Sequence, residues 1–182
     1  MTLRIVAGKF KGRLLQTPKT TLTRPTQGML REAVFNICQM EIMDAHVLDL
    51  YAGSGAIGFE ALSRGAEHVV FVEKNRQAIA CIKKNIEILG VASQVTLMPF
   101  DVPIALKHLQ QPFDLIYVDP PYDLPILPIL EQLVNGHLLK KEGILFVEER
   151  YDPKHPSTIS DKLLLKNSRR FGPAVLHQYF LS

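Results

Sequence analysis

Short apolar runs alternate with helical patterns from residue 45 onward. The runs are HVLDLYA, HVVFVEK, VTLMPF, DLIYVDP and GILFVEE, and their apolar residues are consecutive rather than alternating with polar ones. Strands of this kind are buried on both faces, which is typical of a parallel sheet covered by helices. The pattern therefore predicts βαβ units and a Rossmann-like, doubly wound α/β fold.

The segment 75–89 shows the helical spacing most clearly. Its apolar residues recur every three or four positions, at Ala78, Ile79, Ile82, Ile86 and Leu89. Asn75 can cap the start of this helix, and Gly90 can end it. Further helices are expected near 103–109 and over 126–135.

The last two β-rich segments, KLLLKNSRRF and AVLHQYFL, flank the tripeptide FGP. This spacing leaves no room for a crossover helix, so the two segments are predicted to form an antiparallel hairpin at the sheet edge. We therefore expect a mostly parallel, seven-stranded sheet with an antiparallel C-terminal hairpin.

The first 40 residues follow a different pattern. RIVAGKFKGRLLQ indicates two short strands around a Gly-Lys-Phe-Lys-Gly tip, and RPTQGMLREAVFNIC indicates a helix that begins at Thr26. This segment is too small to fold alone. We expect a β-hairpin and helix extension over 1–40 and the main domain over 41–182.

Composition adds few constraints. The chain has 182 residues, 47% hydrophobic and 21% charged, which suits one globular domain. Cys38 and Cys81 make neither a disulfide framework nor a CxxC site, and the scattered histidines show no metal motif. No signal sequence or membrane span is recognised, so a cytoplasmic protein without a metal is expected.

Charge is distributed unevenly along the chain. Residues 1–40 carry a net charge of +6, whereas the rest of the chain carries −3. Such asymmetry is typical of a protein that holds a polyanion at one end. A solvated basic arm gives the same pattern, and charge alone leaves both interpretations open.

The stretch VLDLYAGSGAIG contains a GxGxxG motif between a predicted strand and a predicted helix. Gly53, Gly55 and Gly58 allow a tight turn and close approach of a ligand to the helix N-terminus. Glu73 lies twenty residues after Gly53, where a carboxylate can accept hydrogen bonds from ribose hydroxyls. These features predict an adenosine-type ligand, although a plain βα turn remains an alternative.

Two further carboxylates bear on the choice of ligand. Asp49 would repel a pyrophosphate but suits an ammonium group, which favours S-adenosylmethionine over NAD without excluding NAD. Asp101 follows VTLMPF and is placed either to bind an adenine amino group or to cap the next helix.

The stretch DLIYVDPPYD delivers Asp119 to the carboxyl edge of the sheet, followed by Pro120, Pro121 and Tyr122. The prolines stiffen the turn, and its carbonyls are expected to be free acceptors. Asp119 and the Pro120 carbonyl can orient an exocyclic amine of a nucleobase, on which Tyr122 stacks. A rigid strand exit without chemistry is the alternative interpretation.

These motifs in this order resemble the class I S-adenosylmethionine-dependent methyltransferases with an Asp/Asn-Pro-Pro-aromatic motif. The N-terminal patterns RIVAGKFKGRLL, RPT at 24–26 and REAVFN at 31–36 resemble more closely the 16S ribosomal RNA guanine-N2 methyltransferase family of the RsmD type. The resemblance covers nearly the whole chain. Gly28 and Met29 depart from it, because the family usually has an acidic and then a basic residue there.

The resemblance implies three groups of site residues and one substrate. The expected catalytic residues are Asp119, Pro120, Pro121 and Tyr122. The expected cofactor site comprises Asp49, Tyr51, Ala52, Gly53, Ser54, Gly55, Glu73, Lys74, Asp101 and Val102. The expected RNA phosphate contacts are Arg4, Lys9, Lys11, Arg13, Arg24 and Arg31.

We expect a monomer that methylates a guanine of 16S ribosomal RNA, free or within an assembling small subunit. Adenine N6 in DNA or RNA and a protein glutamine remain alternative targets of the same chemistry. An NAD-dependent oxidoreductase and a non-catalytic RNA-binding module are alternatives from other classes.

Overall fold

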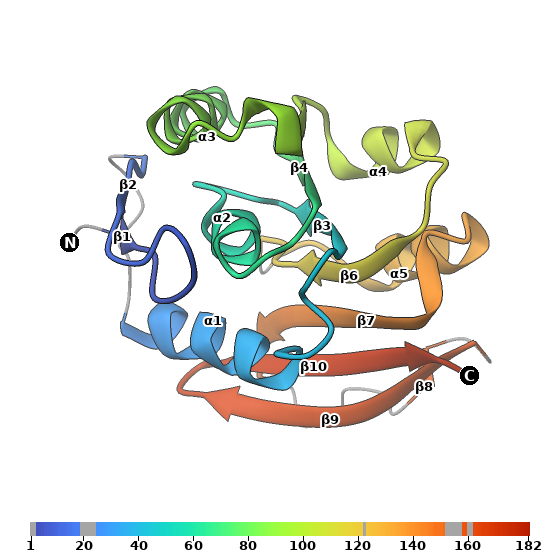
Figure 1. The fold of residues 1–182 in the computed structure, drawn as a ribbon. Coiled ribbons are helices and arrows are strands. Elements are labelled where there is room, and N and C mark those ends of the chain that lie inside the picture. Colours follow the sequence, from blue (N-terminus) through green and yellow to red (C-terminus); the bar gives the residue numbers. More distant parts are fainter. Residues whose placement is uncertain (1–2, 19–24, 122, 152–157, 160–161) are drawn as a thin grey trace.

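The computed structural model describes residues 3–18, 25–121, 123–151, 158–159 and 162–182. In these ranges the main sheet has the strand order β5-β4-β3-β6-β7-β10-β9-β8 (Figure 1). Its parallel part consists of β3 (His46–Leu50), β4 (His68–Val72), β5 (Val95–Met98), β6 (Phe113–Val118) and β7 (Leu139–Arg150). The predicted doubly wound fold is confirmed.

The antiparallel part lies beyond β7. There β10 (Ala174–Leu181) pairs with both β7 and β9 (Leu163–Phe171), as predicted for the C-terminal hairpin. The two-residue strand β8 (Thr158–Ile159) adds an eighth strand beside the seven that the sequence predicts. The sequence pattern missed β8 because two residues carry no periodicity.

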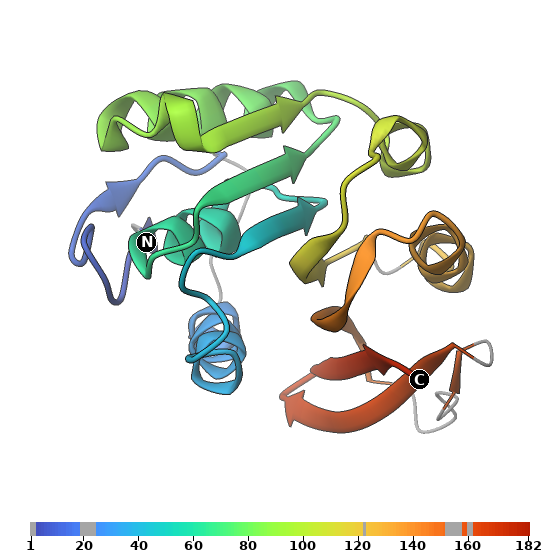
Figure 2. The ribbon, with the colours of Figure 1, turned by 45° about the vertical axis from the view of Figure 1, so that its right-hand side comes forward.

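Helices cover both faces of the sheet (Figure 2). Residues of α1 (Pro25–Ile37), α2 (Ala56–Ser63) and α3 (Arg76–Leu89) share one apolar cluster with the first face. Residues of α4 (Val102–Ala105), the 3₁₀ turn η2 (Leu106–His108) and α5 (Leu127–Asn135) share a second cluster with the opposite face. The 3₁₀ turn η1 (Ala92–Gln94) precedes β5. The sheet therefore separates two cores.

Helix α3 forms as its sequence predicts. The Asn75 side chain accepts hydrogen bonds from the backbone N–H groups of Gln77 (2.9 Å) and Ala78 (3.1 Å). At the other end, Gly90 adopts a left-handed φ of 66°, which ends the helix. Both signals are local in sequence and needed no tertiary information.

The N-terminal hairpin packs on the first core. Strands β1 (Leu3–Arg4) and β2 (Leu14–Leu15) pair antiparallel, with Leu3 opposite Leu15. Ile5 and Leu15 are buried in the cluster that contains α1 and α2. The two predicted strands are present, and each is only two residues long.

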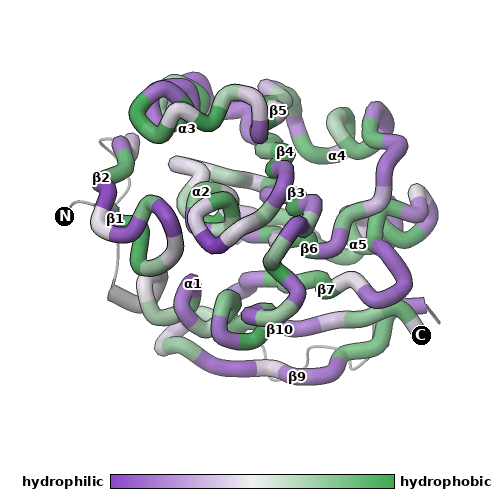
Figure 3. Tube along the Cα trace, in the orientation of Figure 1, coloured by the Kyte–Doolittle hydropathy of each residue, from purple (hydrophilic) through white to green (hydrophobic). Residues whose placement is uncertain are grey.

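Hydropathy follows the layers (Figure 3). The central parallel strands are apolar, whereas β9 alternates buried and exposed positions along much of its length. Such alternation is typical of a strand with one solvated face. Within the described ranges, no helix has the length and apolar character needed to span a bilayer.

Candidate functional site

Four polar side chains lie near the carboxyl ends of β3, β6 and β7, namely Asp49, Tyr117, Asp119 and Glu148. Asp49 is the register partner of Tyr117, and Val118 is the partner of Val147. Asp119 and Glu148 each follow one member of that second pair. Since residues two apart in a strand share a face, all four side chains lie on the face that carries α1 and α2.

These four residues line a cavity of about 140 Å³. Its other walls include Tyr51, Ala52, Gly53 and Ser54 of the glycine loop and Arg31 of α1. Of the described residues that line it, only Arg31 is basic. The cavity is therefore rich in carboxyl groups at the sheet edge where open α/β folds bind ligands.

The glycine loop adopts a conformation that its residues explain. Gly53 and Gly55 have φ angles of 55° and 78°, and Gly55 precedes the first residue of α2. A Cβ atom on Gly58 would lie only 2.2 Å from Cε1 of Phe71, so no larger side chain fits between α2 and β4. Tyr51 is a non-glycine residue with a φ of 59°, a strained conformation at the mouth of the cavity.

Asp49 supports this loop from the sheet. Asp49 is only 2% exposed, and its Oδ2 accepts a hydrogen bond of 3.0 Å from the Gly58 N–H. Burial raises the Asp49 pKa to about 8, and nearby Glu73 adds to the rise while the Gly58 N–H opposes it. A cationic ligand group beside Asp49 would favour its ionised form.

Glu73 ties the glycine loop to the start of α3. Its Oε2 accepts from the Gly53 N–H at 2.8 Å, and its Oε1 accepts from the Asn75 N–H at 2.8 Å. Each carboxylate oxygen has a second lone pair, which leaves acceptor capacity for a ligand. Glu73 therefore contacts the loop although it does not line the cavity.

Asp101 forms the helix cap that the sequence offered as one interpretation. Its Oδ1 accepts from the Val102 N–H at 3.0 Å, and its Oδ2 lies 3.1 Å from Lys74 Nζ. Val102 is buried, whereas Lys74 and Asp101 are partly exposed. These three residues and Gly55 lie outside the cavity lining.

The DPPY turn follows β6. The Asp119 N–H donates to the Leu50 carbonyl at 3.4 Å, which continues the ladder beyond Val118. Burial raises the Asp119 pKa well above its ordinary value, and Glu148 and Asp49 add to the rise. The side chain of Asp119 therefore favours the neutral form unless a ligand supplies hydrogen-bond donors or positive charge.

The sequence led us to expect that the carbonyls of the DPPY turn accept no hydrogen bond within the protein, and one of them does. The Pro121 carbonyl accepts a hydrogen bond of 2.9 Å from the Leu124 N–H. In the part of the chain that the structure describes, no hydrogen bond reaches the Pro120 carbonyl. Pro120 is buried and Pro121 is exposed, while Tyr122 lies outside the described residues.

Sequence reasoning missed Tyr117 and Glu148. The Tyr117 hydroxyl donates to Glu148 Oε2 at 2.7 Å, and Glu148 is 6% exposed. Burial raises the pKa of both groups. One signal was present: Glu148 directly follows the apolar run of the strand after the DPPY turn, at the same sheet edge as Asp119.

The predicted phosphate contacts fall into two groups. Arg4, Lys9, Lys11 and Arg13 are exposed on the N-terminal hairpin, and Arg24 lies outside the described residues. Arg31 is 6% exposed, its Nη2 donates to the Arg4 carbonyl at 2.9 Å, and its Nε lies 3.7 Å from Glu60 Oε2. Burial lowers its pKa. Arg31 thus differs from the surface cation that the sequence predicts.

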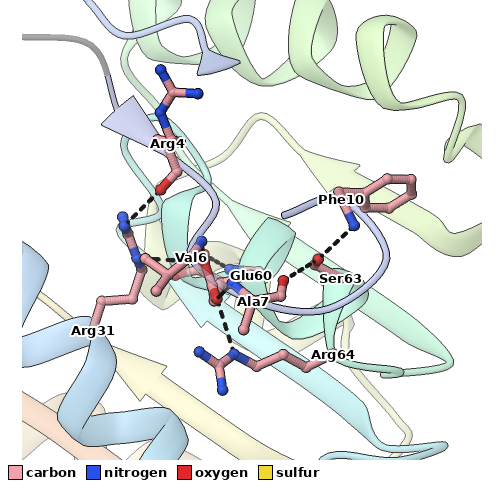
Figure 4. Close-up of polar contacts among 10 residues, drawn as sticks. Arg4, Val6, Ala7, Phe10, Arg31, Glu60, Ser63 and Arg64 are labelled. Atoms are coloured by element: carbon pink, nitrogen blue, oxygen red, sulfur yellow. Dashed lines mark hydrogen bonds and ion pairs between the residues drawn. The ribbon is translucent and has the colours of Figure 1, made fainter. Parts of the chain in front are cut away.

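Glu60 of α2 anchors the hairpin (Figure 4). It is 1% exposed and accepts hydrogen bonds from the backbone N–H groups of Val6 (2.9 Å) and Ala7 (3.0 Å) and from Arg64 Nε (2.9 Å). The Ser63 hydroxyl also donates to the Ala7 carbonyl and accepts from the Phe10 N–H. One helix therefore holds the basic hairpin at one end and the glycine loop at the other.

Comparison with known proteins finds similarity over nearly the whole chain. A family model described as "Conserved hypothetical protein 95" matches residues 3–180. The chain is 33% identical over 174 residues to YlbH of Bacillus subtilis, provisionally named an rRNA methyltransferase, and the match covers 93% of this chain and 94% of YlbH.

Two further similarities agree with that match. The chain is 33% identical over 156 residues to "Ribosomal RNA small subunit methyltransferase D" of Haemophilus influenzae, covering 82% of this chain and 80% of the relative. A solved structure from Escherichia coli, provisionally named methyltransferase yhhF, is 29% identical with a TM-score of 0.89 and covers 98% of this chain and 97% of its own. The resemblance predicted from the sequence is confirmed.

Proposed function

The chain belongs to the family described as Conserved hypothetical protein 95, and we propose that it methylates the N2 amine of one guanine in 16S ribosomal RNA. The predicted enzyme class, an S-adenosylmethionine-dependent rRNA methyltransferase, is confirmed by this membership and by the names of its relatives. The cluster of Asp49, Asp119 and Glu148 beside the glycine loop is the observation that carries the proposal.

The donor set of the cavity fits S-adenosylmethionine. That molecule carries a sulfonium and an ammonium, and a cavity with several carboxyl groups attracts both. Arg31, the basic residue of the described lining, is already engaged by Glu60 and by the Arg4 carbonyl. A pyrophosphate would meet Asp49 at the start of the loop, which argues against NAD.

Each part of the predicted cofactor site has a role in this proposal. Asp49 would hold the ammonium, and the loop from Tyr51 to Gly55 would hold the amino-acid portion. The free lone pairs of Glu73 would accept from the ribose hydroxyls, and Asp101 and Val102 would hold the adenine, with Lys74 keeping Asp101 in place by its ion pair. When bound, S-adenosylmethionine supplies a methyl group whose carbon–sulfur bond breaks, with its electrons moving to sulfur, as the nitrogen–carbon bond forms.

Asp119 and the Pro120 carbonyl act on the amine. Each accepts one N–H of the guanine amino group, which turns the nitrogen lone pair away from the ring and toward the methyl group. Positive charge then develops on nitrogen, and the Asp119 carboxylate stabilises it until one proton passes to that carboxylate or to water. Pro121 keeps the turn rigid, and Tyr122 stacks on the base.

The exposed basic residues of the hairpin suit RNA phosphates. Arg4, Lys9, Lys11 and Arg13 lie on the hairpin, and the proposal adds Arg24 to this surface. Residues 1–40 are then the RNA-contacting extension, and 41–182 the methyltransferase domain. We propose a cytoplasmic monomer that acts on the ribosomal RNA alone or in an assembling small subunit.

The test uses purified protein, labelled S-adenosylmethionine and small ribosomal subunits that lack the modification. Mass spectrometry of the digested RNA should find N2-methylguanosine, and the Asp119→Ala variant should produce none above background. N6-methyladenosine would refute the guanine assignment. Failure to bind S-adenosylhomocysteine in calorimetry, with binding of NADH instead, would refute the cofactor assignment.

A further inference from the structure

Glu148 is a buried acidic residue that contributes to the charge of the cavity but has no contact of its own assigned above. It lies at the end of the β7 stretch that pairs with β6, one residue after Val147, as Asp119 lies one residue after Val118. Both side chains line the same cavity. Glu148 is therefore a second carboxyl group beside the one that binds the amine.

Its hydrogen bonding is incomplete. Within the described residues, Glu148 makes one hydrogen bond, from the Tyr117 hydroxyl to Oε2 at 2.7 Å. No basic side chain of the described residues is paired with it: Arg31 donates to the Arg4 carbonyl, and its Nε lies 3.7 Å from Glu60 Oε2. Among the described residues, Oε1 is not one of the buried side-chain atoms that lack a partner, so it keeps access to the cavity and can accept an N–H group of a ligand.

The shape of a guanine edge supplies such a group. Guanine presents its N1–H directly beside the N2 amine, so it offers neighbouring donors, whereas adenine presents N1 as an acceptor beside its N6 amine. A carboxylate next to Asp119 would accept the N1–H of guanine but would face a lone pair on adenine. Two adjacent carboxyl groups thus match one base and reject the other.

Resting on the proposed function, we infer that Glu148 selects guanine: Tyr117 fixes one of its oxygens and the other accepts the N1–H of the target base. Glu148 is then the specificity residue, and Tyr117 is a positioning residue that acts through it. Both are part of the sheet rather than of a loop, which keeps the acceptor in a fixed place.

The decisive substrate is an RNA with 2-aminopurine at the methylated position. This base keeps the 2-amino group but has an unprotonated N1, so it can be methylated and cannot donate to Glu148. Wild-type protein should prefer guanine by at least about 100-fold in kcat/KM, because a buried acceptor left unpaired discriminates strongly. The Glu148→Gln variant, whose amide can donate to N1, should bring this ratio within about tenfold.

A binding measurement separates recognition from chemistry. The fluorescence of the 2-aminopurine RNA, titrated with protein and S-adenosylhomocysteine, should show tighter binding by Glu148→Gln than by wild type. Tyr117→Phe should lower the guanine preference in part while its thermal unfolding stays close to wild type. Glu142→Gln, on the exposed part of the same strand, is the matched control and should change nothing.

Each result bears on the inference. If wild type makes N2-methylguanosine but Glu148→Gln keeps the full preference over 2-aminopurine, the inference is wrong and the proposed function stands. If Glu148→Gln loses S-adenosylhomocysteine binding, the carboxylate serves the cofactor and the inference is also wrong. If wild type methylates no guanine N2, the proposed function fails and this inference fails with it.

Discussion

Acidic side chains lie inside the molecule in two places, and the two places differ in how many hydrogen-bond donors surround the carboxyl groups. On α2, Glu60 receives two backbone N–H groups and Arg64, and Arg31 lies nearby. At the sheet edge, Asp49, Asp119 and Glu148 share a cavity, and the described residues supply one N–H bond to Asp49 and one hydroxyl bond to Glu148. At the first site the protein fills the acceptors of Glu60 and leaves Arg31 Nε without a hydrogen bond, whereas at the second site most carboxyl oxygens accept no hydrogen bond from the described residues.

This difference separates a structural role from a binding role. A buried carboxylate whose acceptors are filled holds elements together, and here it fastens the hairpin to α2. Carboxyl groups with few donors keep acceptors available for a ligand, and here burial raises the Asp119 pKa, with Glu148 and Asp49 adding to the rise. The number of hydrogen-bond donors around each carboxyl group, rather than its burial, distinguishes the two sites.

The largest expected effect comes from Asp119→Ala. Methylation should fall by about 10²–10⁴-fold, because the amine loses its acceptor and the developing charge its counter-charge. The free energy of unfolding should not fall, since a poorly solvated carboxyl group is removed. Single-turnover methylation with chemical unfolding checks both, and Asp123→Asn on the same turn is the exposed control. Near-normal methylation by Asp119→Ala would contradict the assigned role.

Glu60→Ala should act in the opposite sense. Removing the carboxylate leaves two backbone N–H groups and two arginines without their partner, which should cost about 3–5 kcal/mol of unfolding free energy. Methylation per folded molecule should stay within about tenfold of wild type. The control is Glu87→Ala, whose ion pair with Lys84 is exposed and should be worth under about 1 kcal/mol. A stable but inactive Glu60→Ala protein would mean that this carboxylate also serves the reaction.

Asp49→Asn tests how the carboxyl cluster of Asp49, Asp119 and Glu148 makes stability depend on pH. In the folded protein the Asp49 pKa is about 8, whereas its ordinary value is 3.8. The folded state therefore binds this proton more tightly than the unfolded state, and the stability that results is lost as the pH rises from 3.8 to about 8. The variant should therefore gain about 1–3 kcal/mol in unfolding free energy relative to wild type between pH 5 and pH 9.

The same variant should change how ligand affinity depends on pH. Calorimetry with S-adenosylhomocysteine should show wild-type affinity rising about tenfold or more from pH 6 to pH 8, as a cation displaces the Asp49 proton. Asp49→Asn should bind more weakly and without that slope. A wild-type affinity that is flat over this range would show that Asp49 does not face the ammonium.

The smallest expected effect is that of Ser63→Ala. The hydroxyl contributes one bond to the Ala7 carbonyl and one from the Phe10 N–H, so its loss should weaken the hairpin by about 1 kcal/mol. Hydrogen exchange should speed up at residues 7–10, and the cavity amides should be unaffected. Ser93→Ala, at an exposed position, is the control. Equal loss of protection across the whole sheet would indicate that the hairpin and the core open as one unit.

The sequence predicted the features whose signals are local. The caps of α3, the glycine loop and the exit of β6 at Asp119 all depend on neighbouring residues, and the structure contains each of them. The placement of Arg31 was not predictable in this way. Its charge suggested the surface, but its position on α1 turns it toward Glu60, which comes from a different helix.

Glu148 was missed for a related reason. In sequence it is the first of two glutamates at the end of an apolar run, which marks the sheet edge but does not show which of the two faces the cavity. Its partnership with Tyr117 depends on the register between β6 and β7, which includes an irregularity between Phe113 and Leu115. A shift of one residue would have turned Glu148 to the other face of the sheet.

The order of the last strands has a consequence for how the protein forms. Strand β10 lies between β7 and β9, although β9 is made earlier by the ribosome. While β9 emerges, the position beside β7 is still empty, and the two-residue strand β8 is the strand already made with which β9 pairs in the described sheet. We therefore expect the parallel half to assemble first and the hairpin to dock late and together, because among the described strands β10 is the one that joins β9 to β7.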